Sequence, residues 1–168
     1  LGTVIFGPMI VRICSFFLVA AMVLGAVPIA SAQDGVPRWV SLRSDEVNVR
    51  AGPGTRYPID WVFVRESLPV EVIAEFDNWR QIRDMDGATG WIHQNLLSRN
   101  RFAVIIGDMA MMVRDPEVGG VPVAIIEPGV ITQVLRCRGD WCRLHAGGHT
   151  GWLLRSQIWG VYRDEVVD

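Results

Sequence analysis

The sequence predicts an all-β protein made of two tandem copies of one small antiparallel barrel, preceded by a helical signal peptide. The first observation behind this prediction is an internal repeat, because the order Val-Arg, Trp, Gly-Trp occurs twice with matching positions 61 to 64 residues apart. A repeat of this length indicates two copies of one structural unit. The second observation is that short apolar runs alternate with turn signals beyond the leader, and no helical period is sustained.

The repeat divides the chain into a leader at residues 1–32, a first unit at residues 38–99 and a divergent second unit at residues 101–163. Its members are Val49-Arg50, Trp79 and Gly90-Trp91 in the first copy, and Val113-Arg114, Trp141 and Gly151-Trp152 in the second. The join near residues 98–101 is short and contains neither Gly nor Pro. Each unit has about 60 residues and buries little surface alone, so we expect the two units to pack together.

The leader has the pattern of a secretory signal. Arg12 is its only charged residue, the stretch from Ile13 to Val27 is almost wholly apolar, and Ala30-Ser31-Ala32 offers small residues to a signal peptidase. The alternative is a membrane anchor. The apolar run is marginal for a span of about 20 residues, and no basic cluster follows it. We therefore expect an exported protein that meets the membrane only if this segment is retained.

The first unit contains short strands bounded by turn residues. Strands are expected at residues 47–50, 70–76, 79–83 and 90–93, with a single 3₁₀ turn at residues 95–98. The first strand ends at Ala51-Gly52-Pro53-Gly54, which cannot be helical. Asp77-Asn78 is expected to form one turn. Asp86-Gly87 predicts a two-residue hairpin turn in which both residues take positive φ.

The second unit has the same order of elements. Its strands are expected at residues 110–114, 123–126, 130–137, 141–145 and 151–154, with turns at Arg138-Gly139-Asp140 and Gly147-Gly148. About five short strands per unit favour a small barrel. Closing the sheet into a barrel also removes exposed strand edges.

Composition excludes some classes of function. Without residues 1–32 the chain has 15 basic and 18 acidic residues, a formal net charge of −3. Such a chain has no long-range attraction for phosphate backbones, so no nucleic-acid partner is expected. Every basic residue is Arg, which excludes any mechanism that needs a lysine amine.

Cys137 and Cys142 are the two cysteines that remain after the leader. Three chemical states are open to them, namely a disulfide, a zinc site and free thiols. In an exported protein a close pair on neighbouring strands favours a disulfide. Together with His145 and His149 they also have the zinc-like spacing C-x4-C-x2-H-x3-H, and free thiols are the third alternative. The two histidines straddle a Gly-Gly turn and need not converge. We therefore predict a disulfide, no metal and no cofactor.

The first unit resembles the bacterial SH3-like domain. The matching residues are Val47-Asn48-Val49-Arg50-Ala51-Gly52-Pro53-Gly54, Tyr57-Pro58, Trp79 and Gly90-Trp91-Ile92. Its further sequence is similar to exported tandem-repeat proteins of Gram-negative bacteria. The resemblance implies a five-stranded barrel and non-catalytic binding. It also implies a wall polymer such as peptidoglycan as ligand, because such modules bind the wall in relatives attached to cell-wall hydrolases.

The candidate ligand-binding residues are Arg50, Tyr57, Trp61 and Trp91. The second copy lacks the Gly-Pro-Gly loop and has no aromatic residue at the places of Tyr57 and Trp61, so the first copy is favoured. Aromatic faces suit sugar rings or peptide stems, and an arginine can pair with a carboxylate. The repeat also favours structural roles for some of these residues. Because Arg50 recurs as Arg114, it is expected to fix the loop that follows it, and the four recurring tryptophans are expected to pack in the fold.

Three functions are compatible with these features. The leading one is non-catalytic recognition of peptidoglycan or another envelope polymer. The alternative is a periplasmic adaptor that binds another protein and has no wall ligand. Catalysis has weak support, since a Cys-His pair would need a free thiol with a lowered pKa. Asp84 and Asp86 are expected to be solvated beside a hairpin turn.

Overall fold

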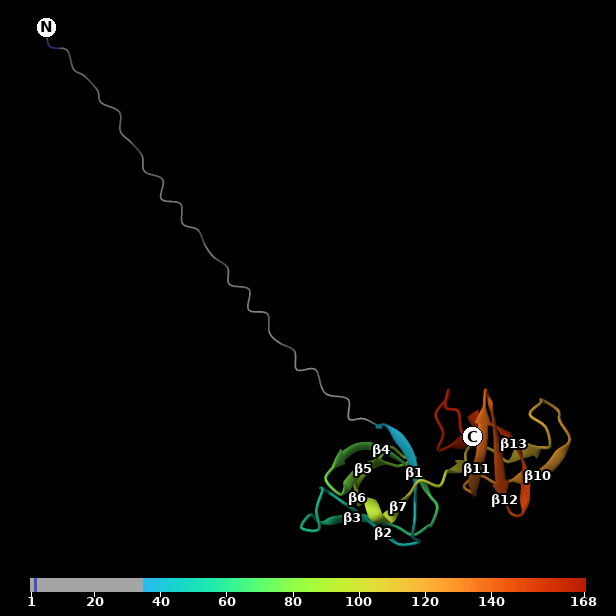
Figure 1. Cartoon of the computed structure of the whole chain (residues 1–168), viewed down its shortest axis with the longest axis horizontal. Coiled ribbons are helices and arrows are strands. Elements are labelled where there is room, and N and C mark those ends of the chain that lie inside the picture. Colours follow the sequence, from blue (N-terminus) through green and yellow to red (C-terminus); the bar gives the residue numbers. More distant parts are fainter. Residues whose placement is uncertain (1, 3–34) are drawn as a thin grey trace. The chain divides into compact units, whose positions relative to one another are not determined.

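The computed structural model describes Gly2 and residues 35–168 (Figure 1). Residues 35–168 belong to one compact unit that contains two successive antiparallel sheets. The predicted signal peptide at residues 1–32 lies outside the described residues, apart from Gly2. The described part contains strands and two short 3₁₀ turns, so the prediction of an all-β protein with two tandem units is confirmed. No helix in the described part is long and apolar enough to cross a membrane.

The first sheet is drawn from blue to yellow-green in Figure 1 and has the strand order β3-β2-β6-β5-β4-β1-β7. Its elements are β1 (Arg38–Leu42), β2 (Val47–Arg50), β3 (Ile59–Phe63), β4 (Pro69–Phe76), β5 (Trp79–Arg83), β6 (Thr89–His93), η1 (Gln94–Leu96) and β7 (Leu97–Ser98). There are seven strands rather than five. The sequence pattern missed β3, β1 and the two-residue β7. Of these, β1 and β7 pair with each other at one end of the sheet order.

The second sheet repeats this topology in the order β10-β9-β13-β12-β11-β8-β14. Its elements are β8 (Phe102–Ile105), β9 (Ala110–Val113), β10 (Pro122–Ile126), β11 (Ile131–Arg138), β12 (Trp141–Ala146), β13 (His149–Leu154), η2 (Arg155–Gln157) and β14 (Ile158–Trp159). Every strand of one sheet thus has a counterpart in the other, with the same neighbours. The duplication seen in the sequence is therefore a duplication of the fold.

Each sheet has its own apolar core, produced by alternation along the strands. In β2, Val47 and Val49 are fully buried, whereas Asn48 and Arg50 between them are only partly buried. Full burial of one aliphatic side chain stabilises a fold by about 1.5–3 kcal/mol. The first core contains Val40, Leu42, Val47, Val49, Val70, Val72, Ile82, Ile92 and Leu97, and a separate cluster fills the second sheet.

The hairpin between β5 and β6 differs from the expectation of a two-residue turn. Only Gly87 of the pair Asp86-Gly87 takes positive φ, at 85°. The Asp84 N–H donates to the Ala88 carbonyl at 3.0 Å, so the loop comprises residues 85–87. The Asp84 carboxylate also accepts the N–H groups of Asp86 and Ala88, at 3.0 and 2.8 Å. A side chain that satisfies loop donors in this way favours the longer loop.

The disulfide prediction is confirmed. Cys137 on β11 lies directly opposite Cys142 on β12, with 4.1 Å between the Cα atoms, and the two sulfur atoms are bonded. Both sulfurs of the zinc alternative are therefore consumed. No group of three or more metal-ligating side chains is found among residues 35–168.

The two sheets contact each other through side chains. The Trp39 ring of β1 meets Trp159 of β14 edge-on, with 4.6 Å between ring centroids, and lies 5.5 Å from Tyr162. The Arg65 guanidinium donates to the Gly129 carbonyl at 2.9 Å. The short join between the units is thus accompanied by aromatic packing and polar contacts.

Candidate functional site

One face of the first sheet carries the candidate site. In β6, Gly90 and Ile92 are buried, whereas Trp91 and His93 are only partly buried. Trp79 lies opposite His93 and Arg50 lies opposite Trp91; residues directly opposite each other share a face of the sheet. We call this the outer face of the first sheet, and its side chains are Asn48, Arg50, Trp79, Gln81, Trp91 and His93.

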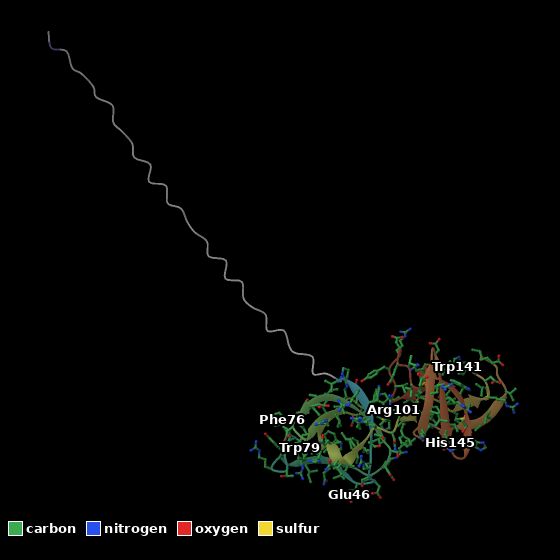
Figure 2. All side chains as sticks on the ribbon, viewed as in Figure 1. Glu46, Phe76, Trp79, Arg101, Trp141 and His145 are labelled. Atoms are coloured by element: carbon green, nitrogen blue, oxygen red, sulfur yellow. A yellow bond between two sulfur atoms is a disulfide. The ribbon has the colours of Figure 1, made fainter. Side chains whose placement is uncertain are left out.

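The outer face contains a shallow depression of about 190 Å³. Its lining residues are Asn48, Arg50, Thr55, Trp79, His93 and Leu96. The rings of Trp79 and His93 meet edge-on, with 5.4 Å between centroids. Trp79 is labelled in Figure 2, beside Phe76 at the end of the β4–β5 hairpin. The site therefore combines an aromatic wall with amide, hydroxyl and guanidinium groups.

Arg50 ties the following loop to the sheet. Its Nη1 donates to the carbonyl oxygens of Thr55 at 3.2 Å and Tyr57 at 2.7 Å. No described residue is hydrogen-bonded to its Nη2. Arg50 therefore holds the loop beside the depression through one end of its guanidinium.

The strand register corrects the sequence alignment of the two copies at Arg50. Arg50 pairs with Trp91, but the residue that pairs with Trp152 is Val113 rather than Arg114. The N–H of Arg114 instead bonds the Val121 carbonyl, as the N–H of Ala51 bonds that of Pro58. The structural counterpart of Arg50 is thus a valine. The recurrence of an arginine is no longer an argument that Arg50 is purely structural.

Tyr57 packs onto its own loop. A Cβ added at Gly52 would lie 2.5 Å from the Tyr57 ring, so the absence of a side chain at Gly52 makes room for the ring. The Arg56 guanidinium lies 5.3 Å from the centroid of the same ring. Tyr57 therefore helps to shape the loop that borders the depression and does not line the depression itself.

Trp61 lies apart from the other candidates. It is opposite Val49, whose side chain is fully buried, so Trp61 is on the inner side of the sheet. Its ring packs against the first core and would come within 3.0 Å of a Cβ at Gly90. The structure thus brings Arg50 and Trp91 to one face and places Trp61 on the other.

Arg50 is the one lining residue of the depression that the sequence predicted as a candidate. The other five are Asn48, Thr55, Trp79, His93 and Leu96. Trp79 was assigned to packing because it recurs as Trp141. His93 could have been found by comparing the two copies. It lies opposite Trp79 in the first sheet, and the residue at the equivalent position, opposite Trp141 in the second sheet, is Leu154. A histidine that is present in only one copy is the kind of difference that singled out Tyr57 and Trp61.

The clear pKa shifts in the described part lie at the contact between the sheets, away from the outer face. Burial and the hydrogen bond to Glu71 raise the pKa of Tyr162 far above its usual value. Burial alone would raise the pKa of Glu165, but hydrogen bonds from Arg101 and the Tyr162 N–H and the nearby arginine charges outweigh it and lower this pKa. These groups are tied into ion pairs and hydrogen bonds, which indicates a structural role.

The comparisons with known proteins bear on both units. No curated protein sequence matches the chain. Among solved structures the chain is similar to NlpC2 from Trichomonas vaginalis, with 12% identity, a TM-score of 0.34, and coverage of 73% of this chain and 48% of the other. The corresponding values for NlpC1 from the same organism are 14%, 0.34, 80% and 50%. For an NlpC/P60 family protein from Bacillus cereus they are 9%, 0.33, 72% and 55%.

The chain spans about half the length of these solved structures. The family comparison is more specific, because the bacterial SH3 domain matches twice, at residues 43–99 and 107–160. These two matches cover more than half of the chain; the first includes β2 to β7 and the second β9 to β14. The chain belongs to the bacterial SH3 domain family.

Proposed function

We propose that this chain is an exported, non-catalytic protein that recognises a cell-wall polymer, with peptidoglycan as the leading ligand, through the outer face of the first sheet. The observation that carries the proposal is the depression in which Trp79, His93 and Arg50 meet. Aromatic rings stack against the apolar faces of sugars, and the polar groups beside them offer hydrogen bonds to hydroxyls and amides. Membership of a family of wall-binding modules supports the same ligand.

The second sheet offers different chemistry at the equivalent positions. Where the first sheet has Asn48, Arg50 and His93, the second has Met111, Val113 and Leu154, by the register of the paired strands. Apolar side chains at these positions supply few hydrogen bonds to a sugar. We therefore assign polymer recognition to the first sheet and a supporting role to the second.

One observation favours the alternative of a periplasmic adaptor. Met111 and Ile125 lie opposite each other on β9 and β10 and are 47% and 68% exposed. Met109, Val118 and Val121 are also exposed large apolar side chains of the same unit. Exposed apolar patches mark protein-interaction surfaces, so a protein partner would be expected to contact the second sheet.

A sedimentation experiment with isolated sacculi tests the proposal. The purified protein is expected to pellet with peptidoglycan sacculi, and Trp91→Ala is expected to weaken this binding. Trp152→Ala is the matched control, because Trp152 holds the same register position in the second sheet. Thermal unfolding of both variants separates loss of binding from loss of fold.

The outcomes are distinct. Equal binding by the two variants, or protein that stays in the supernatant, contradicts recognition through the outer face of the first sheet. Co-purification of a defined periplasmic protein would favour the adaptor if the interaction persists after the wall has been digested.

A further inference from the structure

Four arginines converge beside two adjoining depressions of the first sheet. Arg38, Arg43, Arg80 and Arg99 line a depression of about 420 Å³. A neighbouring depression of about 510 Å³ shares Arg38, Arg80 and Arg99 with it and adds Glu75. We call the two together the arginine depression. Arg80 and Arg99 are distant in the sequence from Arg38 and Arg43, so the fold is what brings the two pairs together.

The arginine depression is distinct from the outer face. Arg80 lies opposite Ile92, which is fully buried, whereas Trp79 lies opposite His93. Arg80 and Trp79 therefore point to opposite faces of the sheet. The depression on the outer face and the arginine depression are thus separate places in the first unit.

The arginine depression is strongly positive. Its lining includes four arginines and a single carboxylate, that of Glu75, which leaves three net positive charges at this place in a chain whose formal net charge is −2. Arg43 and Arg99 have no ion pair with any described residue, and both are exposed. Like charges held this close repel one another, and an anionic ligand relieves that repulsion.

The positions of Arg38 and Arg80 are fixed by the fold. Arg80 is only 14% exposed, and it donates to the Asp77 and Trp79 carbonyls at 2.8 and 3.0 Å and to Gln94 Oε1 at 2.6 Å. Arg38 and Arg80 both contact the Glu75 carboxylate, at 2.5 and 3.3 Å. A carboxylate is therefore already held by two of the four arginines, which shows the chemistry that this site favours.

The other groups of the depression suit a peptide. Asn95 provides an exposed amide donor and acceptor, and Val40 and Leu97 add apolar side chains to the lining. Gln94 also lines the depression, where its amide is bonded to Arg80 and Asn78. We infer that the arginine depression binds a short acidic peptide through two or more of its carboxylates, with Arg43 and Arg99 as the groups that contact it. This inference rests on the proposed function, in which that peptide is the carboxylate-bearing stem peptide of the wall polymer.

Calorimetric titration with a soluble, carboxylate-bearing wall stem peptide tests the inference. The double variant Arg43→Gln/Arg99→Gln is expected to bind about tenfold more weakly or worse, because charge-assisted hydrogen bonds to two carboxylates are lost. These two arginines are chosen because Glu75 is held by the other two. Arg136→Gln is the matched control, since Arg136 is an exposed arginine of the second sheet. Raising the salt concentration is expected to weaken binding by the unmodified protein through screening.

Two further titrations test whether the arginine depression prefers a peptide to other anionic ligands. Inorganic phosphate and vesicles with anionic lipid are titrated in the same way. Binding of either one as tightly as the peptide, with the same loss in the double variant, overturns the assignment to a peptide. Absence of peptide binding, or equal affinity in the double variant and Arg136→Gln, overturns the site itself.

Sedimentation with sacculi separates this inference from the proposed function. If sacculi retain the protein through Trp91 while the peptide does not bind, the inference fails and the proposed function stands. If the peptide binds but sacculi do not retain the protein, wall recognition fails and the site for an acidic peptide stands.

Discussion

The phenolic hydroxyl of Tyr162 donates a hydrogen bond to Oε1 of Glu71, at 2.9 Å, and this bond joins the two sheets. Glu71 is 7% exposed, and its other oxygen accepts two bonds from Arg83, at 2.9 and 2.6 Å. A buried carboxylate is costly unless its oxygens are hydrogen-bonded. The second sheet thus supplies a partner that a group in the first sheet requires.

We expect Tyr162→Phe to lower the free energy of unfolding by about 1–3 kcal/mol, because Oε1 of Glu71 loses its donor while still buried. The measurement is urea unfolding followed by tryptophan fluorescence. Tyr57→Phe serves as a control, since no hydrogen bond of the Tyr57 hydroxyl is found among the described residues. Equal stability of Tyr162→Phe and the unmodified protein would show that the bond between the sheets contributes nothing.

The lowered pKa of Glu165 leads to a prediction of how the stability of the fold changes at acid pH. Its pKa is lowered in the folded state, where Arg101 and the Tyr162 N–H bond its carboxylate although burial opposes the charge. A group with a depressed folded pKa contributes stability above its unfolded pKa, and this stability is lost as pH falls through the folded pKa. Melting temperature is therefore expected to fall as pH drops below about 4.5, the ordinary value for Glu. Glu165→Gln should be less stable at pH 7 and show a shallower fall.

A side chain added at Gly52 is expected to clash within the loop beside the depression. A methyl group there would lie 2.5 Å from the Tyr57 ring, so the ring or the loop must move. We expect Gly52→Ala to cost about 1–3 kcal/mol in stability, as overpacking does elsewhere. Gly54→Ala is the matched control, because its Cβ would meet the same ring at an ordinary 3.4 Å. Chemical unfolding of both variants checks this, and equal stabilities would contradict it.

Much of the fold was predictable because strand alternation and turn residues act locally. The hairpin of Ala146 and His149 closes around Gly147-Gly148 with both glycines at positive φ, as the Gly-Gly pair predicts. The two-residue turn predicted at Asp86-Gly87 was wrong because the carboxylate of Asp84, two residues before Asp86, stabilises a longer loop. The strand β1 was missed because it pairs with β4 and β7, which are distant in the chain.

The candidate site was only partly predictable for a related reason. Arg50 and Trp91 meet because β2 pairs with β6, and the sequence pattern includes both. The sequence pattern did not separate Trp61 from the other candidates, because its inward orientation depends on its register opposite Val49. The arginine depression had no sequence signal at all, since a net negative composition conceals a local positive cluster that forms only on folding.

The Cys137–Cys142 disulfide gives a prediction about the second sheet. Reduction should raise the mass by about two units, as expected for one S–S bond that gains two hydrogens. The double variant Cys137→Ala/Cys142→Ala should lose about 2 kcal/mol of stability, because the bond restricts the unfolded chain even though the ring is small. Both sulfurs are fully buried, so reduction should be slow until the second sheet opens. Rapid reduction of the native protein, timed by mass spectrometry, would contradict the buried position of this bond.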